Sequence, residues 1–357
     1  MRRIGILTGG GDCPGLNAVI RAVAKGALLG HGIEVVGFNN GFKGLVENDA
    51  WLITEEAVSG ILHRGGTILG TTNRDNPFKF AVTGADGQVR YEDRSRQALE
   101  HLEKWRVDCL VVVGGDGSLA LGHRFAGLGV PVVGIPKTID NDLSATDVTF
   151  GFDSAVATAT DAIDKIHTTA ESHHRVMVVE VMGRHAGWIA LQAGMAGGGD
   201  IILIPEIPFS YDAVLAKIEE RRSRGKKFSI VVVAEGAFPQ GGEPVYQSVA
   251  GTRRLGGIGQ VVATEIERRS AMESRATVLG HLQRGGTPTP FDRVLATRFG
   301  VKAVELIASG RAGEMVCLQG GVVKSVPLSE GIAELKRVDP QSEQVRAALA
   351  VGTSFGR

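Results

Sequence analysis

The sequence has 357 residues, of which 39 are Lys or Arg and 39 are Asp or Glu, so its formal net charge is zero. That balance argues against a dedicated nucleic-acid or anionic-membrane binder, which carries a basic excess, and the length predicts two domains at roughly 150 residues each. Glycine is the outlier, with 50 residues or about twice the usual share, and the glycines follow apolar runs, where tight turns and close ligand approach need them.

Short β-branched runs alternate with longer helical stretches along most of the chain. The predicted strands are 4–7, 35–38, 109–113, 131–135, 176–181, 201–204, 228–234 and 276–279. The predicted helices are 18–29, 118–125, 152–169, 185–196 and 212–224. Continuous apolar strands that alternate with helices predict a parallel sheet covered on both faces. The predicted fold class is therefore α/β, with two domains of mostly parallel sheets flanked by helices.

Two predicted strands end in Gly-Gly-Asp followed by a helix, at 10–12 and 114–116. Glycines let backbone N–H groups approach phosphate oxygens, and a helix N-terminus adds the positive end of its dipole. A carboxylate beside such a cradle holds Mg²⁺ when phosphates supply other ligands, so we predict a nucleotide-phosphate site with Asp116 on the metal. The alternative for either loop alone is a turn with an N-cap aspartate. Neither loop is a P-loop, and Pro14 interrupts the dinucleotide fingerprint.

The segment from Thr138 to Asp142 places two carboxylates, an amide and a hydroxyl directly after a predicted buried strand. A phosphoryl acceptor needs a base at hydrogen-bond distance, and alternate residues of an extended loop point the same way. Asp140 and Asp142 are therefore predicted to share one face, one as the base and the other as its neighbour. The alternative is a pair of capping aspartates in an Asx-turn.

Five cations are predicted at strand edges or in loops that follow strands: Arg175, Arg184, Arg275, His281 and Arg284. In a neutral protein they favour a small anionic substrate such as a sugar phosphate. The alternative for each arginine is a solvated surface charge, and for His281 a structural hydrogen bond.

Three cysteines stand far apart, at Cys13, Cys109 and Cys317. An odd number at such spacing does not predict a disulfide framework, so a reducing compartment is expected. The apolar stretch 4–7 is too short for a signal-peptide core, and no apolar run approaches the ~18 residues of a membrane helix. We expect a cytoplasmic protein that binds neither nucleic acid nor a membrane.

Together these loops resemble the 6-phosphofructokinase family. The matching motifs are Thr8–Asn17, Gly114–Ser118, Pro136–Asp142, Met182–Arg184 and Leu279–Gly286, and they follow the family order within residues 4–300. The family transfers a phosphoryl group to the 1-hydroxyl of fructose 6-phosphate. The resemblance implies a glycolytic kinase that uses ATP and Mg²⁺, with a nucleotide domain of residues 1–150 plus about 283–330. Residues 151–282 plus about 331–357 would then bind the sugar phosphate.

The resemblance also implies a role for each matching residue. Asp140 resembles the base that accepts the hydroxyl proton, with Asp142 beside it. Contacts to the transferring phosphoryl group are implied for Thr138, Arg184 and Gly10. The donor and its metal would be held by Arg74, Gly115, Asp116, Gly117, Ser118 and Lys137. The sugar phosphate would be bound by Thr138, Asp140, Met182, Gly183, Arg184, Glu235, His281 and Arg284, and by Arg175 and Arg275 across a subunit interface. That division implies a homodimer or homotetramer with shared active sites.

The sequence gives conflicting indications about the phosphoryl donor. Gly117 matches the ATP-using branch of the family and Lys137 the pyrophosphate-using branch, while the two together resemble a set of ATP-dependent members. Asn73 stands where many relatives have a transition-state arginine, with Arg74 next to it. The main prediction is ATP and the alternative is a pyrophosphate-dependent enzyme with the same acceptor.

Three further alternatives are weaker. An NAD or lipid kinase would share Gly-Gly-Asp-Gly but not the motif 281–284. A nucleotide-sensing regulator without catalysis would lose Asp140 and Asp142. An oxidoreductase is disfavoured by the interrupted fingerprint.

Overall fold

The computed structural model describes residues 2–249, 252–270 and 272–357. The chain divides into two compact units. Unit 1 runs up to Thr138 and continues through Leu143–Asp153 and Arg284–Leu335. Unit 2 comprises Ile139–Asp142, Ser154–Gln283 and Lys336–Arg357.

Unit 1 is built on a seven-stranded sheet with the order β15-β14-β7-β6-β1-β2-β3. Its strands are β1 (Arg3–Thr8), β2 (Glu34–Phe38), β3 (Ala50–Ile53), β6 (Cys109–Gly114), β7 (Val132–Pro136), β14 (Glu314–Gln319) and β15 (Val322–Pro327). The strands from β14 to β2 run parallel, whereas β3 and β15 pair antiparallel at the two edges. Every residue of β6 is buried, as expected for a strand covered on both faces.

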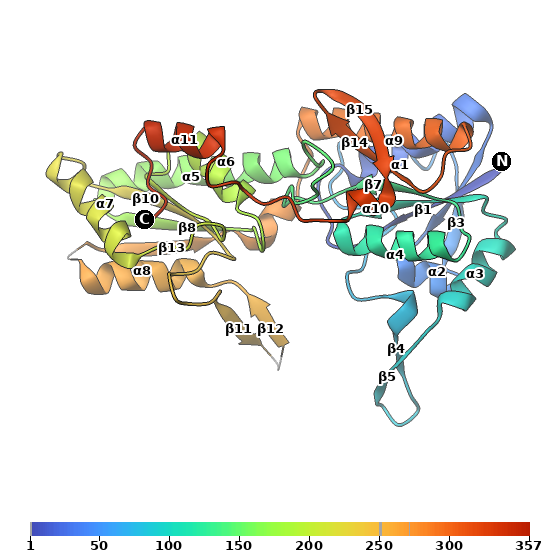
Figure 1. The fold of residues 1–357 in the computed structure, drawn as a ribbon, viewed down its shortest axis with the longest axis horizontal. Helices are drawn as coiled ribbons and strands as arrows, with labels where there is room; N and C mark the ends of the chain where they lie inside the picture. Colours follow the sequence, from blue (N-terminus) through green and yellow to red (C-terminus); the bar gives the residue numbers. More distant parts are fainter. Residues whose placement is uncertain (1, 250–251, 271) are drawn as a thin grey trace. The chain divides into compact units, whose positions relative to one another are not determined.

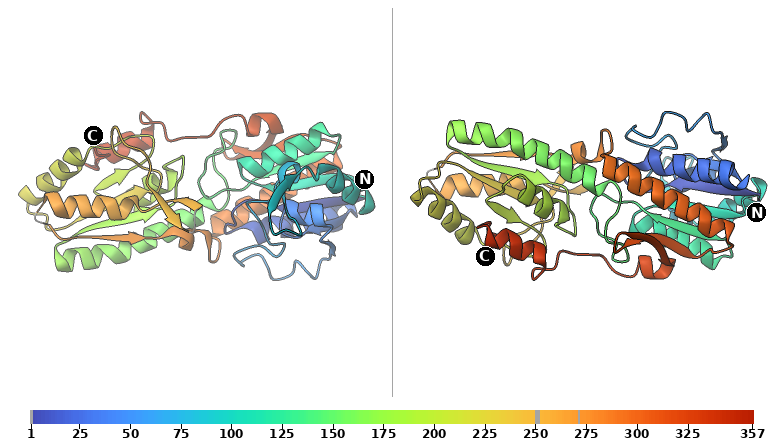
Figure 2. Two further views of the ribbon diagram at one scale, coloured as in Figure 1. Left: turned by 90° about the horizontal axis from the view of Figure 1, so that it is seen from below. Right: turned by 90° about the horizontal axis from the view of Figure 1, so that it is seen from above.

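Helices cover both faces of this sheet (Figures 1 and 2). They are α1 (Leu16–His31), α2 (Phe42–Glu47), α3 (Ser95–Lys104), α4 (Asp116–Gly127), α9 (Pro290–Ala308) and α10 (Leu328–Gly331). Helices α1 and α9 lie side by side on one face, and α2, α3 and α4 lie on the other. A hairpin of β4 (Phe80–Thr83) and β5 (Val89–Glu92) follows the short helix η1 (Pro77–Lys79) and projects beyond α2 and α3.

Unit 2 has an all-parallel four-stranded sheet with the order β13-β8-β10-β9. Its strands are β8 (Val176–Val181), β9 (Ile201–Leu203), β10 (Ser229–Ala234) and β13 (Ser274–Val278). Its helices are α5 (Phe152–His173), α6 (Trp188–Ala196), α7 (Tyr211–Ser223), α8 (Ile258–Arg269), η2 (Gly280–Arg284) and α11 (Glu343–Ala350). Helices α7 and α8 pack on one face of the sheet, and β11 (Tyr246–Val249) forms a hairpin with β12 (Thr252–Leu255).

The two edges of this sheet differ in their pairing with other segments. The outer edge of β9 pairs with the C-terminal segment, where the Ile202 N–H donates to the Ser354 carbonyl at 2.8 Å. The outer edge of β13 has no strand partner among the residues that the structure describes, and Val278 on that strand is 55% exposed. An open edge with an exposed apolar residue invites pairing or coverage by another chain.

The predicted α/β class with mostly parallel sheets is confirmed. Each predicted strand is present, with boundaries shifted by a few residues at most. The sequence pattern did not identify β3, the β4–β5 and β11–β12 hairpins, the β14–β15 pair, or the helices α2, α3, α8 and α9. In the described part of the chain, no helix combines the length and the apolar character needed to cross a membrane.

Candidate active site

The loops after β1 and β6 meet at the point where the strand order reverses. The chain leaves β1 for β2 on one side, and β6 later enters on the other side, which is where open α/β sheets bind ligands. The Gly9 N–H donates to the Val113 carbonyl at 2.9 Å. A Cβ at Gly9 would lie 2.6 Å from the Ser118 hydroxyl, and one at Gly114 would lie 2.3 Å from the Ser118 Cβ. Both loops therefore need glycine to pack against buried Ser118.

Helix α4 begins at this junction, with Gly115 as its N-cap and Asp116 as its first residue. Asp116 and Gly117 are exposed, and a Cβ built at Gly117 meets nothing within 4 Å beyond its chain neighbours and the backbone of its own helix. The first-turn N–H groups of a helix have no intrahelical acceptor, and the helix dipole favours an anion there. This end of α4 is therefore suited to bind phosphate groups.

Asp116 lies at this junction without a protein metal cage around it in the described residues. Among residues 2–249, 252–270 and 272–357, no three His, Cys, Asp or Glu side chains gather to hold a metal ion by themselves. Mg²⁺ commonly takes one or two carboxylates together with substrate phosphates and water. An exposed Asp116 beside a phosphate cradle fits that pattern.

Lys137 and Arg284 both contact the loop that follows β1. Lys137 is 3% exposed, and its ammonium donates to the Gly11 carbonyl. The Arg284 guanidinium donates to the Asp12 carbonyl at 3.2 Å. Two cations thus flank a glycine loop that lies at the end of the sheet, as an anion site requires.

The segment around Thr72 covers the other side of this loop. The Gly10 N–H donates to the Thr72 carbonyl at 2.9 Å, and the Thr71 hydroxyl donates to the Gly10 carbonyl at 2.7 Å. Arg74 lies exposed in the bend that follows. The Gly10 N–H, predicted as a phosphoryl contact, is therefore bonded to protein backbone in this structure.

The segment 138–142 follows β7 and is held by the backbone at several points. The Thr149 hydroxyl donates to the Thr138 carbonyl at 2.7 Å. Asp140 and Asp142 are half-buried and flank Asn141, which is 4% exposed with a φ of 51°. The Lys336 N–H donates to the Asp142 carbonyl at 2.8 Å. The two carboxylates thus belong to a segment that hydrogen bonds anchor at both ends.

In unit 2, the loops after β8, β10 and β13 lie at one end of the parallel sheet. The Glu235 N–H donates to the Val181 carbonyl at 2.9 Å. The fully buried Gln283 accepts from the Met182 N–H at 3.3 Å and donates to the Gly280 carbonyl at 3.2 Å. The structure therefore brings together three motifs that are far apart in sequence, namely 182–184, 235 and 280–283.

Two predicted substrate cations sit at the other end of that sheet. Arg175 immediately precedes β8 and Arg275 is the second residue of β13. A six-residue strand rises about 3.3 Å per residue, so the ends of β8 lie roughly 20 Å apart. Within one chain, these arginines therefore cannot reach a small molecule bound beside Met182.

Glu273 links the two arginines. Its carboxylate accepts from the Arg175 Nε at 2.8 Å and from the Arg275 guanidinium. The hydrogen bond from Arg175 lowers the pKa of Glu273, and the positive charges of both arginines act in the same direction. Sequence reasoning missed Glu273, because an acidic residue two positions before an arginine looks like an ordinary surface pair.

The cysteines carry no site chemistry. Cys13 lies in the first glycine loop, and Cys109 begins β6. Burial raises the pKa of each thiol to about 12, so the reactive thiolate is scarce at neutral pH. Iodoacetamide at pH 8 should leave both native thiols unmodified by mass spectrometry, whereas the denatured chain should be alkylated. Alkylation of either native thiol as fast as an exposed one would contradict their burial.

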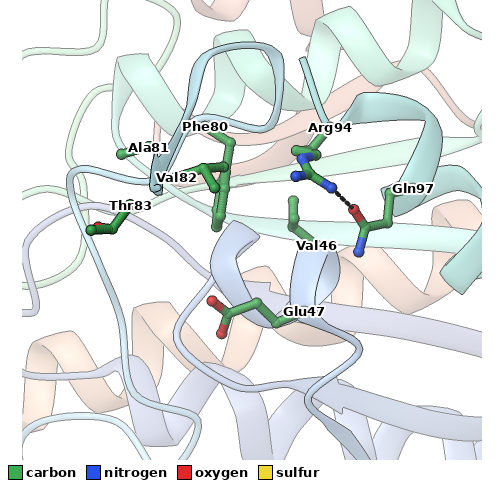
Figure 3. A pocket seen from close by; sticks show the side chains of 8 residues that line it. All are labelled: Val46, Glu47, Phe80, Ala81, Val82, Thr83, Arg94 and Gln97. Atoms are coloured by element: carbon green, nitrogen blue, oxygen red, sulfur yellow. Dashed lines mark hydrogen bonds between the residues drawn. The ribbon is translucent and has the colours of Figure 1, made fainter. Parts of the chain in front are cut away.

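A pocket of about 320 Å³ lies beside β4, between that strand and residues of α2 and α3 (Figure 3). Its lining residues are Val46, Glu47, Phe80, Ala81, Val82, Thr83, Arg94 and Gln97. The Arg94 guanidinium donates to Gln97 at 3.1 Å and pairs with Glu92 at 2.7 Å. None of the predicted site residues lines it.

Comparison with known proteins gives consistent matches. The family model Phosphofructokinase matches residues 3–307. "ATP-dependent 6-phosphofructokinase 2" of Clostridium perfringens is 52% identical over 99% of this chain and 98% of its own. "Pyrophosphate--fructose 6-phosphate 1-phosphotransferase" of Amycolatopsis mediterranei is 53% identical over 96% of this chain and 98% of its own.

Solved structures agree with these matches. Pichia pastoris phosphofructokinase in the T-state is 32% identical with a TM-score of 0.81 over 99% of this chain, which spans 37% of the yeast chain. The family predicted from the sequence motifs is confirmed. This chain belongs to the phosphofructokinase family.

Proposed function

We propose that this chain is an ATP-dependent 6-phosphofructokinase, which transfers the terminal phosphoryl group of ATP to the 1-hydroxyl of fructose 6-phosphate. The observation that carries the proposal is the meeting of the β1 and β6 loops at the start of α4, a phosphate cradle beside Asp116. The name of the Clostridium perfringens relative supports ATP as the donor.

Two parts of the chain have separate roles in the proposal. The nucleotide-binding part is residues 1–150 plus about 283–330, and it contains the cradle. The sugar-phosphate part is residues 151–282 plus about 331–357. Donor contacts are proposed for Gly10, Arg74, Gly115, Asp116, Gly117, Ser118 and Lys137. Asp116 would hold Mg²⁺, which neutralises phosphate charge when bound.

In the proposed reaction, Asp140 accepts the proton of the 1-hydroxyl, with Asp142 beside it. Thr138, Arg184 and the Gly10 N–H stabilise the charge of the transferring phosphoryl group. For this contact the Gly10 N–H must exchange its Thr72 carbonyl acceptor for a phosphoryl oxygen. Catalysis then rests on positioning and charge rather than on covalent chemistry.

The sugar phosphate is proposed to bind at the carboxyl end of the unit 2 sheet. Met182, Gly183, Arg184 and Glu235 contact the sugar, and His281 is exposed beside them for the 6-phosphate. Arg284 also serves the 6-phosphate, since a guanidinium has five donors and the Asp12 carbonyl takes one.

Arg175 and Arg275 are proposed to complete the site of a neighbouring subunit. Two features support this: the roughly 20 Å between the ends of β8, and the open outer edge of β13. We infer a homodimer or homotetramer with shared active sites. We also propose a cytoplasmic location, on the strength of three buried cysteines that form no disulfide.

Subunit mixing tests the shared site. Arg175→Ala and Arg284→Ala should each weaken binding of fructose 6-phosphate and spare ATP binding, because each removes cations from the 6-phosphate. In a mixed oligomer, some sites combine an intact Arg284 from one subunit with an intact Arg175 from its neighbour. The activity of the mixture should therefore exceed that of either variant alone. Subunit exchange is verified by native mass spectrometry with a mass-labelled parent. Verified exchange without any gain in activity would contradict the shared site.

The reaction itself is tested by product analysis. Purified protein with fructose 6-phosphate, ATP and Mg²⁺ should form fructose 1,6-bisphosphate and ADP in equal amounts, identified by ³¹P NMR. Pyrophosphate-dependent transfer to the same acceptor is the second candidate, favoured by Lys137 and by the Amycolatopsis mediterranei relative. Failure to form the bisphosphate with either donor would refute the proposed acceptor.

A further inference from the structure

Lys336 reaches the proposed catalytic segment from 195 residues away in sequence. Its ammonium donates to the Asn141 Oδ1 at 2.9 Å, and its backbone N–H donates to the Asp142 carbonyl at 2.8 Å. Asn141 stands between the proposed base Asp140 and its neighbour Asp142. One residue therefore contacts the segment through both its side chain and its backbone.

Lys336 is itself fixed by α6 and the loop after β9. The Trp188 indole donates to the Lys336 carbonyl at 2.9 Å, and the Lys336 ammonium lies 5.8 Å from the centre of the indole ring. Two residues along, the Val338 N–H donates to the Glu206 carboxylate at 2.8 Å, which also accepts from the Gly187 N–H at 3.0 Å. The segment 336–338 is thus bonded to the start of α6 by two independent contacts.

The backbone at Asn141 needs such support. Its φ of 51° lies in the left-handed region, which Asn tolerates better than most residues but which still costs free energy. Its side chain is buried, so the amide oxygen needs a donor. The Lys336 ammonium is that donor, and it brings a positive charge next to a segment with two carboxylates.

We propose that Lys336 is a positioning residue for phosphoryl transfer, which holds Asn141 so that Asp140 and Asp142 face the acceptor hydroxyl. This inference rests on the proposed function. A displacement of about 1 Å in a catalytic group costs on the order of 10²-fold in rate. The sugar itself is bound by other residues, so its binding should depend little on Lys336.

The test compares kcat and KM across a small set of variants. Lys336→Met keeps an unbranched side chain of similar size and removes the ammonium, so kcat should fall about 10²-fold while the KM for fructose 6-phosphate changes less than about threefold. Lys336→Arg restores a charged donor, so its kcat should be at least tenfold higher than that of Lys336→Met. Lys227→Met, at an exposed lysine of unit 2, is the matched control and should behave as wild type.

Asn141→Gly removes the acceptor and keeps the positive φ, so it tests the same contact from the other side. If Lys336 acts through Asn141, combining Lys336→Met with Asn141→Gly should lower kcat by much less than the two single fold-losses multiplied together. Should Lys336→Met fail to fold, Lys336→Arg and Asn141→Gly still decide the question, because a normal kcat in Asn141→Gly would overturn the proposal.

Other outcomes are also distinguishable. An active wild type with a kcat for Lys336→Met within threefold overturns the positioning role alone. Equal losses in Lys336→Met and Lys336→Arg, or a rise in KM without a fall in kcat, also overturn it. A wild type that is inactive on fructose 6-phosphate with both donors overturns the proposed function and this inference together.

Discussion

Asp140→Asn should lower kcat by about 10²–10⁴-fold while the KM for fructose 6-phosphate changes little. The substitution preserves size and polarity but removes the ability to accept the hydroxyl proton. Asp140 lies in the hydrogen-bonded segment after β7, so the variant should keep its fold. Steady-state kinetics with saturating ATP measures the effect.

The matched control is Asp164→Asn, which makes the same chemical change at an exposed position of α5. It should retain wild-type kcat and KM. If Asp140→Asn kept more than a tenth of the wild-type kcat, Asp140 would not be the base. Asp142→Asn would then be the variant to measure, since its carboxylate is the other one in the segment.

Gly117→Asp should selectively damage ATP turnover. Gly117 has no side chain, and the space beside it is open to solvent, so the α-phosphate of ATP can lie against the loop. An aspartate there would repel that phosphate: two unit charges ~4 Å apart interact by ~4 kcal/mol at an effective dielectric of ~20, before solvent relaxation. We expect kcat/KM for ATP to fall by up to about 10³-fold. Pyrophosphate is shorter and should be affected less.

The structure makes this variant interpretable. A Cβ at Gly117 meets nothing within 4 Å beyond its chain neighbours and the backbone of its own helix, and an acidic residue in the first turn of α4 suits the helix dipole. Loss of ATP use would therefore come from the ligand and not from misfolding. Gly117→Asn has the same shape without the charge, so it separates crowding from repulsion. Equal losses with ATP and pyrophosphate in Gly117→Asp would contradict the predicted position of the nucleotide.

Lys137 contributes less than Gly117 to the prediction of the phosphoryl donor. Its side chain is almost fully buried, and one of its donors already serves the Gly11 carbonyl. An ammonium has three donors, so it can still contact a terminal phosphate. Since either donor has such a phosphate, this contact by itself does not discriminate between them, although Lys137 matches the pyrophosphate-using branch. The open space at Gly117 does, because only ATP has an α-phosphate and a nucleoside beyond its two terminal phosphates.

The fold could largely be predicted from the sequence because most strands are buried on both faces. Strands such as β1, β6 and β8 consist almost entirely of apolar residues, and that pattern distinguishes them from amphipathic helices. The missed edge strands and the exposed hairpin lack this pattern, although β14 has a buried apolar run. Strand β15 is an edge strand with mixed burial, and the hairpin β4–β5 is mostly exposed. Their positions depend on tertiary pairing rather than on local sequence.

The candidate site could be predicted only where its residues form local motifs. The glycine loops, the segment 138–142 and the motif 280–284 each combine several informative residues in a short stretch. Lys336 and Glu273 contact predicted site residues, but each looks like an ordinary surface charge in the sequence. Only the fold brings Lys336 to Asn141, and no local signal in the sequence predicts that contact.

The most direct test of the central claim compares the two donors on the wild-type enzyme. Initial rates of fructose 1,6-bisphosphate formation are measured with fructose 6-phosphate and Mg²⁺, varying either ATP or pyrophosphate. We predict a larger kcat/KM for ATP than for pyrophosphate. A larger kcat/KM for pyrophosphate, or no ATP-dependent product, would contradict the claim that this phosphofructokinase uses ATP.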